Sequence, residues 1–264
     1  MEAIGPYRIT DRLGGGRNTR VFAAEHLDKA VAIKLLTPAK RRRQRMMRSG
    51  HSDPLPQWRA AFEREVDLLT DIQHPAIVKV LDHGQTDDGN PYFIMPRYPE
   101  TLANKLWGSN FPQPVAQPLD CMTARKLLMD ILDGAGELHR SGIVHRDLKP
   151  QNILIGEDAV MCDFGHAIRV ADIGEQDIKR PGTFPYTAPE QRDGSTKPDG
   201  AADIYAIGLI AHLMFAGRLP RDGENIRDNV RPIDLADWIN AALNPDPAQR
   251  PRGGPADLYS LGDL

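Results

Sequence analysis

The stretch VHRDLKPQNILI, at residues 144–155, decides the interpretation of this chain. Within it, Asp147 precedes Asn152 in a short polar segment that leads into an apolar run. An aspartate can orient a hydroxyl nucleophile, and an asparagine oxygen can bind a metal ion if the segment folds back on itself. The stretch AVMCDFG, at residues 159–165, is typical of a strand that ends in a second metal ligand, Asp163. Hard oxygen ligands suit Mg²⁺, and the phosphates of a substrate usually complete its coordination shell. The pattern therefore indicates a nucleotide.

The bulk properties favour a globular cytoplasmic protein. The 264 residues carry a formal net charge of −3, which says little about partners. Two cysteines, Cys121 and Cys162, provide no disulfide framework. The N-terminus lacks a secretion signal, and the longest apolar run, residues 204–216, is shorter than the roughly 20 residues that cross a bilayer. We therefore expect no membrane segment and predict that residues 204–216 form a buried helix.

Hydrophobic periodicity divides the chain into two parts. β-type runs with turns between them occupy residues 7–14, 19–26, 29–36, 77–84 and 91–98. Apolar residues at helical spacing predict one helix over 60–72, and the later sequence is mainly helical, including an amphipathic segment at 123–142. Proline, glycine and polar residues predict loops at 37–57 and 107–120. We thus expect a small β-rich part and a larger helical part, joined near residues 96–99.

Several further motifs follow one another in a characteristic order. They are LGGGRNTRVF at 13–22, VAIK at 31–34, FEREVDLL at 62–69, HRDLKPQN at 145–152, DFG at 163–165 and APE at 188–190. Together they resemble the protein kinases, closest in style to the bacterial Ser/Thr kinases that look like eukaryotic ones, from about Tyr7 to Pro251. The resemblance implies an α+β, two-lobed protein kinase-like fold. Residues 1–95 would form an N-lobe with a small antiparallel sheet and a helix αC, 96–99 the hinge, and 100–264 a mainly helical C-lobe.

The resemblance also implies roles for residues of the second part. Asp147 would accept or orient the proton of the substrate hydroxyl, and Lys149 would steady the transferring γ-phosphoryl group. Thr183 would bridge these two side chains. Asn152 and Asp163 would hold Mg²⁺.

In the first part, Lys34 would bind the α- and β-phosphates of ATP, positioned by an ion pair with Glu65. Glu65 is preferred to Glu63 because it lies nine residues before His74, the family's spacing. The alternative is that both glutamates are solvated helix residues.

The other ATP-binding positions implied by the resemblance lie in the glycine-rich loop, on neighbouring strands and at the hinge. They are Leu13, Gly14, Gly15, Gly16, Val21, Ala32, Met95, Pro96 and Tyr98. The loop departs from the family pattern at Thr19, where a third glycine is usual, and at Asn18, where an aromatic residue is usual. Because threonine is less permissive than glycine, we expect weaker ATP binding rather than its loss.

Three further residues are implied to hold the second part together. Glu190 would pair with Arg250, and Asp203 would anchor the backbone of the catalytic loop from a buried helix. The peptide-binding APE segment favours a protein substrate over a small molecule, and Lys149 with Thr183 favours Ser/Thr specificity over tyrosine. We therefore predict a protein kinase that transfers the γ-phosphoryl group of Mg·ATP to Ser/Thr hydroxyls of protein substrates, including itself. The alternatives are a small-molecule kinase and a nucleotide-binding pseudokinase or scaffold regulated by a partner.

The segment between the DFG motif and Thr183 is unusual, because residues 165–182 contain no Ser, Thr or Tyr. In many relatives the arginine that matches Arg146 pairs with a phosphorylated residue of this segment, and the pairing orders the segment. We predict that a carboxylate, Glu175 or Asp177, substitutes for the phosphate, so that activity requires no loop phosphorylation. The alternative is a mobile segment that a partner or substrate orders.

Two other departures concern partners. The basic run KRRRQRMMR, at 40–48, lies in an insertion that is longer than usual for the family. We expect a solvated, mobile arm; the alternative is electrostatic recruitment of an acidic partner, with nucleic acid not expected. The chain between Gly217 and Arg250 is shorter than in most relatives, so the helix that often docks substrates is expected to be reduced or absent.

Overall fold

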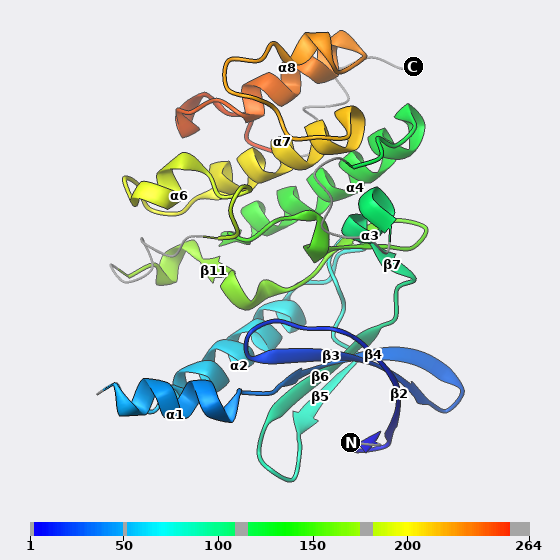
Figure 1. Cartoon of the computed structure of the whole chain (residues 1–264), viewed down its shortest axis with the longest axis vertical. Helices are drawn as coiled ribbons and strands as arrows, with labels where there is room; N and C mark the ends of the chain where they lie inside the picture. The colour runs from blue at the N-terminus through cyan, green and yellow to red at the C-terminus, as the bar shows by residue number, and fades with distance from the viewer. Residues whose placement is uncertain (1–2, 50–51, 109–115, 175–181, 254–264) are drawn as a thin grey trace. The chain divides into compact units, whose positions relative to one another are not determined.

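The computed structural model describes residues 3–49, 52–108, 116–174 and 182–253 (Figure 1). The chain forms two compact units, which we call unit 1 (Met1–Gln73 and Val78–Arg97) and unit 2 (His74–Ile77 and Tyr98–Leu264). The chain thus leaves unit 1 for the last time between Arg97 and Tyr98, within the 96–99 stretch.

Unit 1 is built on one antiparallel six-stranded sheet with the strand order β1-β2-β3-β4-β6-β5. Its strands are β1 (Ala3–Ile4), β2 (Tyr7–Gly14), β3 (Thr19–His26), β4 (Lys29–Leu36), β5 (Asp82–Gln85) and β6 (Pro91–Pro96). Strands β2, β3 and β4 have the predicted bounds, whereas the run at 77–84 joins this sheet only from Asp82 onward. Alternate residues Val31, Ile33 and Leu35 of β4 share one core with Tyr92 and Ile94 of β6, as the two-residue period of a strand requires.

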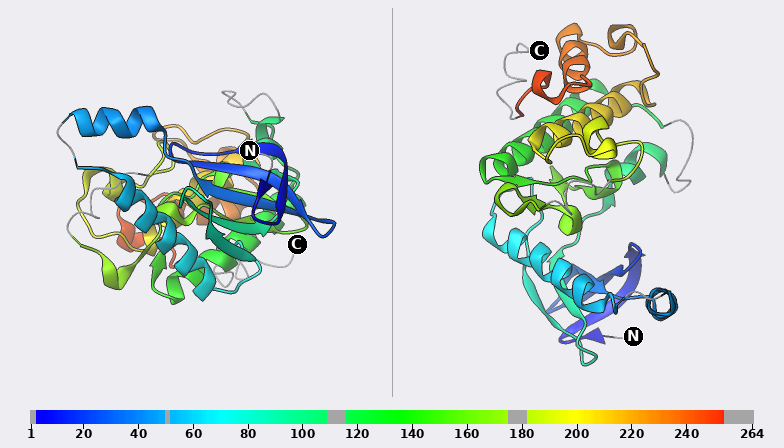
Figure 2. Two further views of the ribbon diagram at one scale, coloured as in Figure 1. Left: turned by 90° about the horizontal axis from the view of Figure 1, so that it is seen from below. Right: turned by 90° about the vertical axis from the view of Figure 1, so that its left-hand side faces the viewer.

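Helix α2 (Leu55–Asp71) covers the other face of this sheet, as Figure 2 shows. The ring of Phe62 on α2 lies 5.6 Å from that of Phe93 on β6. Phe62, Val66 and Leu69 are buried at helical spacing, so the helix predicted over 60–72 is present and begins earlier, at Leu55.

The loop predicted over 37–57 is wrong in its centre and at its end. Residues Lys40–Arg48 form helix α1, and α2 already begins at Leu55. Lys, Arg, Gln and Met are all strong helix formers, and their propensity favours a helix here although no apolar period marks it.

Unit 2 is mainly helical. Its elements in chain order are β7 (Glu100–Thr101), α3 (Leu102–Trp107), α4 (Cys121–Arg140), β8 (Ile143–Val144), η2 (Pro150–Asn152), β9 (Ile153–Ile155), β10 (Ala159–Met161), η3 (Phe164–His166), β11 (Ile168–Arg169), η4 (Val170–Asp172), α6 (Pro189–Asp193), α7 (Gly200–Ala216), η5 (Ile226–Asp228), α8 (Ile233–Ala242) and η6 (Pro247–Gln249). Short strands form a sheet of order β10-β9-β7 and a β11-β8 pair. Between α7 and α8 the only helical element is the short η5, which agrees with the expected reduction of the docking helix.

Two long helices, α4 and α7, organise this unit. Asp120 caps α4 by accepting a hydrogen bond from the Thr123 amide, and Asp199 caps α7 in the same way at Ala201. Most of α7 is buried, as predicted for residues 204–216, and it ends at Gly217 in the left-handed conformation. Over the described parts of the chain, no helix has both the length and the apolar character needed to span a bilayer.

The loop predicted at 107–120 can be compared with the structure only over part of its length. Trp107 closes helix α3, residues 116–120 form neither helix nor strand, and residues 109–115 lie outside the described residues.

Candidate active site

A short loop in unit 2 carries the residues expected to orient the substrate hydroxyl. It connects β8 to η2 and presents Asp147, of which only 6% is exposed. The Asn152 amide nitrogen donates to the Asp147 backbone carbonyl over 2.9 Å and lies 3.3 Å from Oδ2. The loop therefore does fold back on itself, as the spacing of these two residues required.

Thr183 and Lys149 complete a closed set of hydrogen bonds with Asp147. The Thr183 amide and hydroxyl donate to Asp147 Oδ1 over 2.9 and 2.7 Å. Lys149 Nζ donates to Asp147 Oδ2 and to Thr183 Oγ1, both over 2.7 Å. The Thr183 hydroxyl thus accepts from the ammonium and donates to the carboxylate, which is the bridging position expected of it.

Gly182 allows Thr183 to approach Asp147 closely. A Cβ atom at this position would lie 2.6 Å from the Arg146 carbonyl oxygen, a distance that real Cβ atoms do not tolerate. Sequence reasoning did not single out Gly182, because its requirement arises from a contact between segments far apart in the chain.

Asp203 on α7 fixes the backbone of the same loop. Its carboxylate, 1% exposed, accepts hydrogen bonds from the amides of His145 and Arg146, each over 2.8 Å. These two bonds hold Arg146 at a φ of 66°, a conformation that is costly for a residue with a side chain. The Asp203 carboxylate therefore offsets local strain in the loop.

His139 is the residue of this network that sequence reasoning missed. At the end of α4, its Nε2 atom lies 3.0 Å from Asp203 Oδ2. Burial alone would raise the pKa of the Asp203 carboxyl, but the hydrogen bond from His139 and the nearby His145 donors hold this pKa below its ordinary value. No local pattern marks His139, because its partner is reached only in the folded chain.

Asn152 and Asp163 form the candidate metal site. The Cys162 amide donates to the Asn152 carbonyl over 2.9 Å, which ties the strand end before Asp163 to the catalytic loop. With Asn152 Nδ2 committed to Asp147, Oδ1 is the atom left for a cation. Asp163 has a φ of 63°, and the adjacent Phe164 ring packs 4.7 Å from the His145 ring.

These residues fit a magnesium ion whose coordination shell is completed by substrate phosphates. Across the described residues, no three His, Cys, Asp or Glu side chains gather into a group able to hold a metal by themselves. An amide oxygen and one carboxylate are the small hard-oxygen set from which Mg²⁺ is usually bound together with phosphates.

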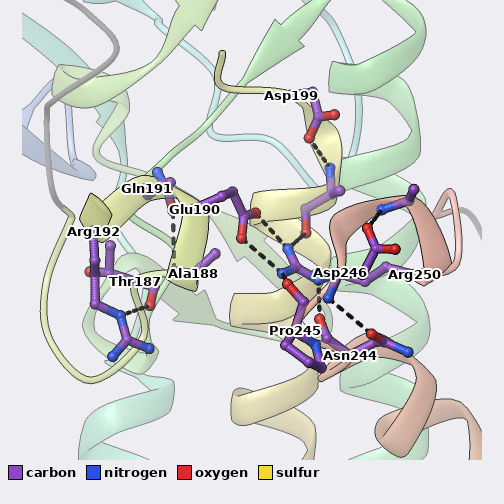
Figure 3. A network of polar contacts seen from close by, with 12 residues as sticks. Thr187, Ala188, Glu190, Gln191, Arg192, Asp199, Asn244, Pro245, Asp246 and Arg250 are labelled. Atoms are coloured by element: carbon purple, nitrogen blue, oxygen red, sulfur yellow. Dashed lines mark hydrogen bonds and ion pairs between the residues drawn. The ribbon is translucent and has the colours of Figure 1, made fainter. Parts of the chain in front are cut away.

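The pairing expected for Glu190 and Arg250 is present. The guanidinium NH1 and NH2 groups donate to the two Glu190 oxygens over 2.6 and 2.8 Å, deep inside unit 2 (Figure 3). Its remaining hydrogen bonds go to the carbonyls of Ala201, Asn244 and Pro245. Because the buried guanidinium is fully hydrogen-bonded, this pair ties the APE motif at α6 to the first turn of α7 and to the residues on either side of η6.

The Arg146 side chain binds the segment that follows the DFG motif. Its Nε atom donates to the His166 carbonyl over 2.7 Å, and the side chain is buried. Glu175 and Asp177, the carboxylates predicted to substitute for a phosphate, lie outside the described residues.

Unit 1 contains the expected lysine–glutamate pair. Lys34 Nζ on β4 donates to both carboxylate oxygens of Glu65 on α2, over 2.6 and 2.9 Å. Only 6% of Lys34 and 2% of Glu65 are exposed. The spacing argument that preferred Glu65 to Glu63 therefore selected the glutamate that faces the lysine.

The glycine-rich loop accommodates its unusual threonine. The Gly16 amide donates to the Thr19 backbone carbonyl over 3.0 Å and lies 3.4 Å from the Thr19 hydroxyl. Gly15 has a φ of 142°, and a Cβ there would lie 2.4 Å from the Thr19 carbonyl. Thr19 thus helps to close the turn, and Gly15 is the position at which glycine is indispensable.

The other implied ATP-binding residues lie on the same sheet, with one exception. Val21 pairs with Lys34 across β3 and β4, and Ala32 pairs with Met95 across β4 and β6. Ala32 and Met95 are buried, and Pro96 ends β6. The exception, Tyr98, belongs to unit 2, where burial raises the pKa of its hydroxyl.

Known proteins include many with similar sequences. The sequence profile of the protein kinase domain family matches residues 7–251. The chain is 32% identical over 232 residues to serine/threonine-protein kinase pkn2 of Myxococcus xanthus, covering 83% of this chain and 25% of that protein. It is also 32% identical over 228 residues to serine/threonine-protein kinase PrkC of Bacillus subtilis, covering 84% of this chain and 32% of that protein.

A solved structure agrees with the fold. The kinase domain of PknI from Mycobacterium tuberculosis, crystallised as a point mutant, superposes with a TM-score of 0.64 and 25% sequence identity, covering 94% of this chain and 91% of that one. The chain spans only about a quarter to a third of the length of the two curated relatives. The match over nearly its whole length nevertheless establishes that the chain belongs to the protein kinase domain family.

Proposed function

We propose that this chain is an active protein Ser/Thr kinase that uses Mg·ATP. The observation that carries the proposal is the closed set of hydrogen bonds among Asp147, Lys149 and Thr183. A pseudokinase has no need to keep a buried carboxylate, an ammonium and a hydroxyl in mutual register. The names of the curated relatives, all Ser/Thr protein kinases, favour the same activity.

The proposed chemistry begins at the Asp147 carboxylate. Oδ1 is held by two donors from Thr183, so the carboxylate is fixed in one orientation. Oδ2 accepts from Lys149, and this bond is released when the ammonium turns toward the γ-phosphoryl group. Oδ2 then accepts the proton of a substrate Ser or Thr hydroxyl, whose oxygen attacks phosphorus while the bond to the β-phosphate oxygen breaks.

Positioning and charge neutralisation supply most of the proposed catalysis. Lys34, held by Glu65, binds the nucleotide phosphates. Asn152 and Asp163 hold Mg²⁺, which neutralises charge on the transferring phosphate when it is bound. Lys149 follows the γ-phosphoryl group from ATP to the substrate oxygen.

We also propose that activity does not depend on phosphorylation of the segment between the DFG motif and Thr183. That segment has no acceptor hydroxyl, and Arg146 already donates to the His166 carbonyl. A substituting carboxylate, Glu175 or Asp177, remains part of this proposal.

The test is incubation of the purified chain with Mg·ATP and a generic basic protein substrate, beside Asp147→Asn, followed by mass spectrometry. We expect phosphoserine or phosphothreonine only with the native sequence, with a loss of about 10²–10⁴-fold in the variant. ATP that stays bound without turnover, shown by a nucleotide-dependent thermal shift, would contradict the proposal and favour the pseudokinase. If the double variant Glu175→Lys/Asp177→Lys is as active as the native chain, neither carboxylate takes the place of a phosphate. The proposal of kinase activity would still stand.

A further inference from the structure

Helix α1, Lys40–Arg48, has two different sides. At about 100° per residue, four of its cations fall within an arc of about 140°. All four are exposed, and in the described part of the chain none of them forms an ion pair. Arg43 and Met46, on the opposite side, are half-buried. The four cations, which we call the basic face of α1, are Lys40, Arg41, Arg45 and Arg48.

The basic face is unfavourable for the helix that carries it. Lys40 and Arg41 lie in the first turn, which contains no acidic residue, so their charges oppose the helix dipole. Arg41 and Arg45 are four residues apart and repel each other. Ala39, at the N-cap, makes no side-chain hydrogen bond to the first turn. Such a concentration of broken local rules is typical of a functional surface.

A salt link nevertheless holds α1 in place at the start of α2. Arg43 Nε donates to Asp53 Oδ1 over 2.7 Å, and its NH2 group bonds the other carboxylate oxygen. Asp53 Oδ1 also accepts from the amide of Leu55, the first residue of α2. The hydrogen bond to Arg43 is the main reason why the pKa of Asp53 lies below its ordinary value. The inner side of α1 is therefore occupied, and the basic face is directed away from it.

We propose that the basic face of α1 binds an acidic segment of a protein partner, rich in Asp and Glu. Carboxylates placed along this face relieve the repulsion between Arg41 and Arg45 and compensate the missing acids of the first turn. Arginine offers paired donors that match a carboxylate, so the three arginines favour carboxylates over a diffuse counter-ion cloud. The inference is independent of catalysis, because the basic face contains none of the residues assigned to ATP or substrate.

Two other anionic partners fit the surface less well. Nucleic acid binding usually combines an extended basic surface with stacking aromatic side chains, whereas α1 contains no aromatic residue and the chain carries a net charge of −3. Membrane-bound amphipathic helices oppose their cations with Trp, Phe or Leu. Here Met46 is half-buried beside Arg43, and the exposed Met47 borders Lys40, so the two methionines form no continuous apolar face that could enter a lipid surface.

The experiment is a fluorescence anisotropy titration of the whole chain against a labelled Glu-rich peptide at low and high salt. The test variant converts all four cations of the basic face to Gln, which keeps helix propensity. The matched control removes the same charge at four exposed cations elsewhere that are assigned to no site. Its substitutions are Lys29→Gln, Lys79→Gln, Lys197→Gln and Arg252→Gln.

We expect the native chain to bind the peptide in a salt-sensitive manner, the test variant to lose at least about tenfold in affinity, and the control to change less than about twofold. Circular dichroism melting establishes that both variants fold. No binding by the native chain, or equal losses in the two variants, would overturn the proposal. Tighter binding of an RNA oligonucleotide of equal charge, or of anionic lipid vesicles, would overturn the assignment to an acidic protein segment.

Discussion

The catalytic loop of unit 2, residues 145–152, and helix α1 of unit 1 both concentrate charge, and they handle it in opposite ways. In the loop, Asp147 meets Lys149 and Thr183, and the loop backbone donates to the buried carboxylate of Asp203. In α1, the four cations of the basic face are exposed and form no ion pair with any described residue. A buried charge without a partner costs several kcal/mol, whereas an exposed one is screened by water and salt. Charge in the loop is therefore committed to contacts within unit 2, and charge on α1 is available for binding.

The strongest way to break this comparison is to remove the charge that anchors the loop. Asp203→Asn replaces a carboxylate oxygen, which accepts from a buried amide, with a group that itself donates. We expect a loss of about 3 kcal/mol in the free energy of unfolding, because buried donors lose a charged acceptor. Urea denaturation measures it. Asp199→Asn is the matched control on the same helix: asparagine caps a helix as well as aspartate, so it should change stability by a few tenths of a kcal/mol at most.

The pH dependence of stability tests the same charge without changing the backbone contacts. Since the pKa of Asp203 is lower in the folded chain than its ordinary value of about 3.9, its contribution is present above about pH 4 and is lost as the pH falls through the lowered value. The native chain should therefore lose stability more steeply below pH 4 than Asp203→Asn does. Parallel pH profiles for the two proteins would mean that Asp203 does not act as a folded-state carboxylate.

A smaller change tests whether the Thr183 hydroxyl holds Asp147 in its catalytic orientation. Thr183→Ala removes both hydroxyl bonds but leaves the backbone amide bond to Asp147. We expect a fall of about 10- to 100-fold in kcat/KM, the size of effect produced by a misplaced reacting group, with little change in thermal stability. Thr183→Ser keeps the hydroxyl and should restore most of the activity. If serine is no better than alanine, the hydroxyl bridge has no part in the reaction.

The loop and α1 also differ in how far sequence could predict them. The loop contains residues at short fixed spacings, which predict that it folds back, and alternating runs between turns predict the bounds of strands β2, β3 and β4. Glu65 was selected by its distance from His74, and it is the glutamate that meets Lys34.

What sequence could not provide are contacts that exist only after folding. His139 acquires its role from Asp203 on another helix, and Gly182 from the approach of the Arg146 carbonyl. Helix α1 was missed for another reason. Its apolar residues are too few to give a period, and its charges and the prolines that flank it resemble a loop although its residues have high intrinsic helix propensity.

The smallest predicted effect concerns the stability of α1. Arg41→Glu places an acid in the first turn, where it complements the helix dipole and lies four residues before Arg45. We expect α1 to become more stable by about 1 kcal/mol, seen as a roughly fivefold slowing of hydrogen exchange at its amides. Arg48→Glu makes the same change of charge in the last turn, where the acid opposes the dipole, so its gain should be clearly smaller. Equal gains at both ends would mean that total charge, and not its arrangement along the helix, limits the stability of α1. In that case the basic face would lose the local electrostatic conflict on which its assignment as a binding surface partly rests.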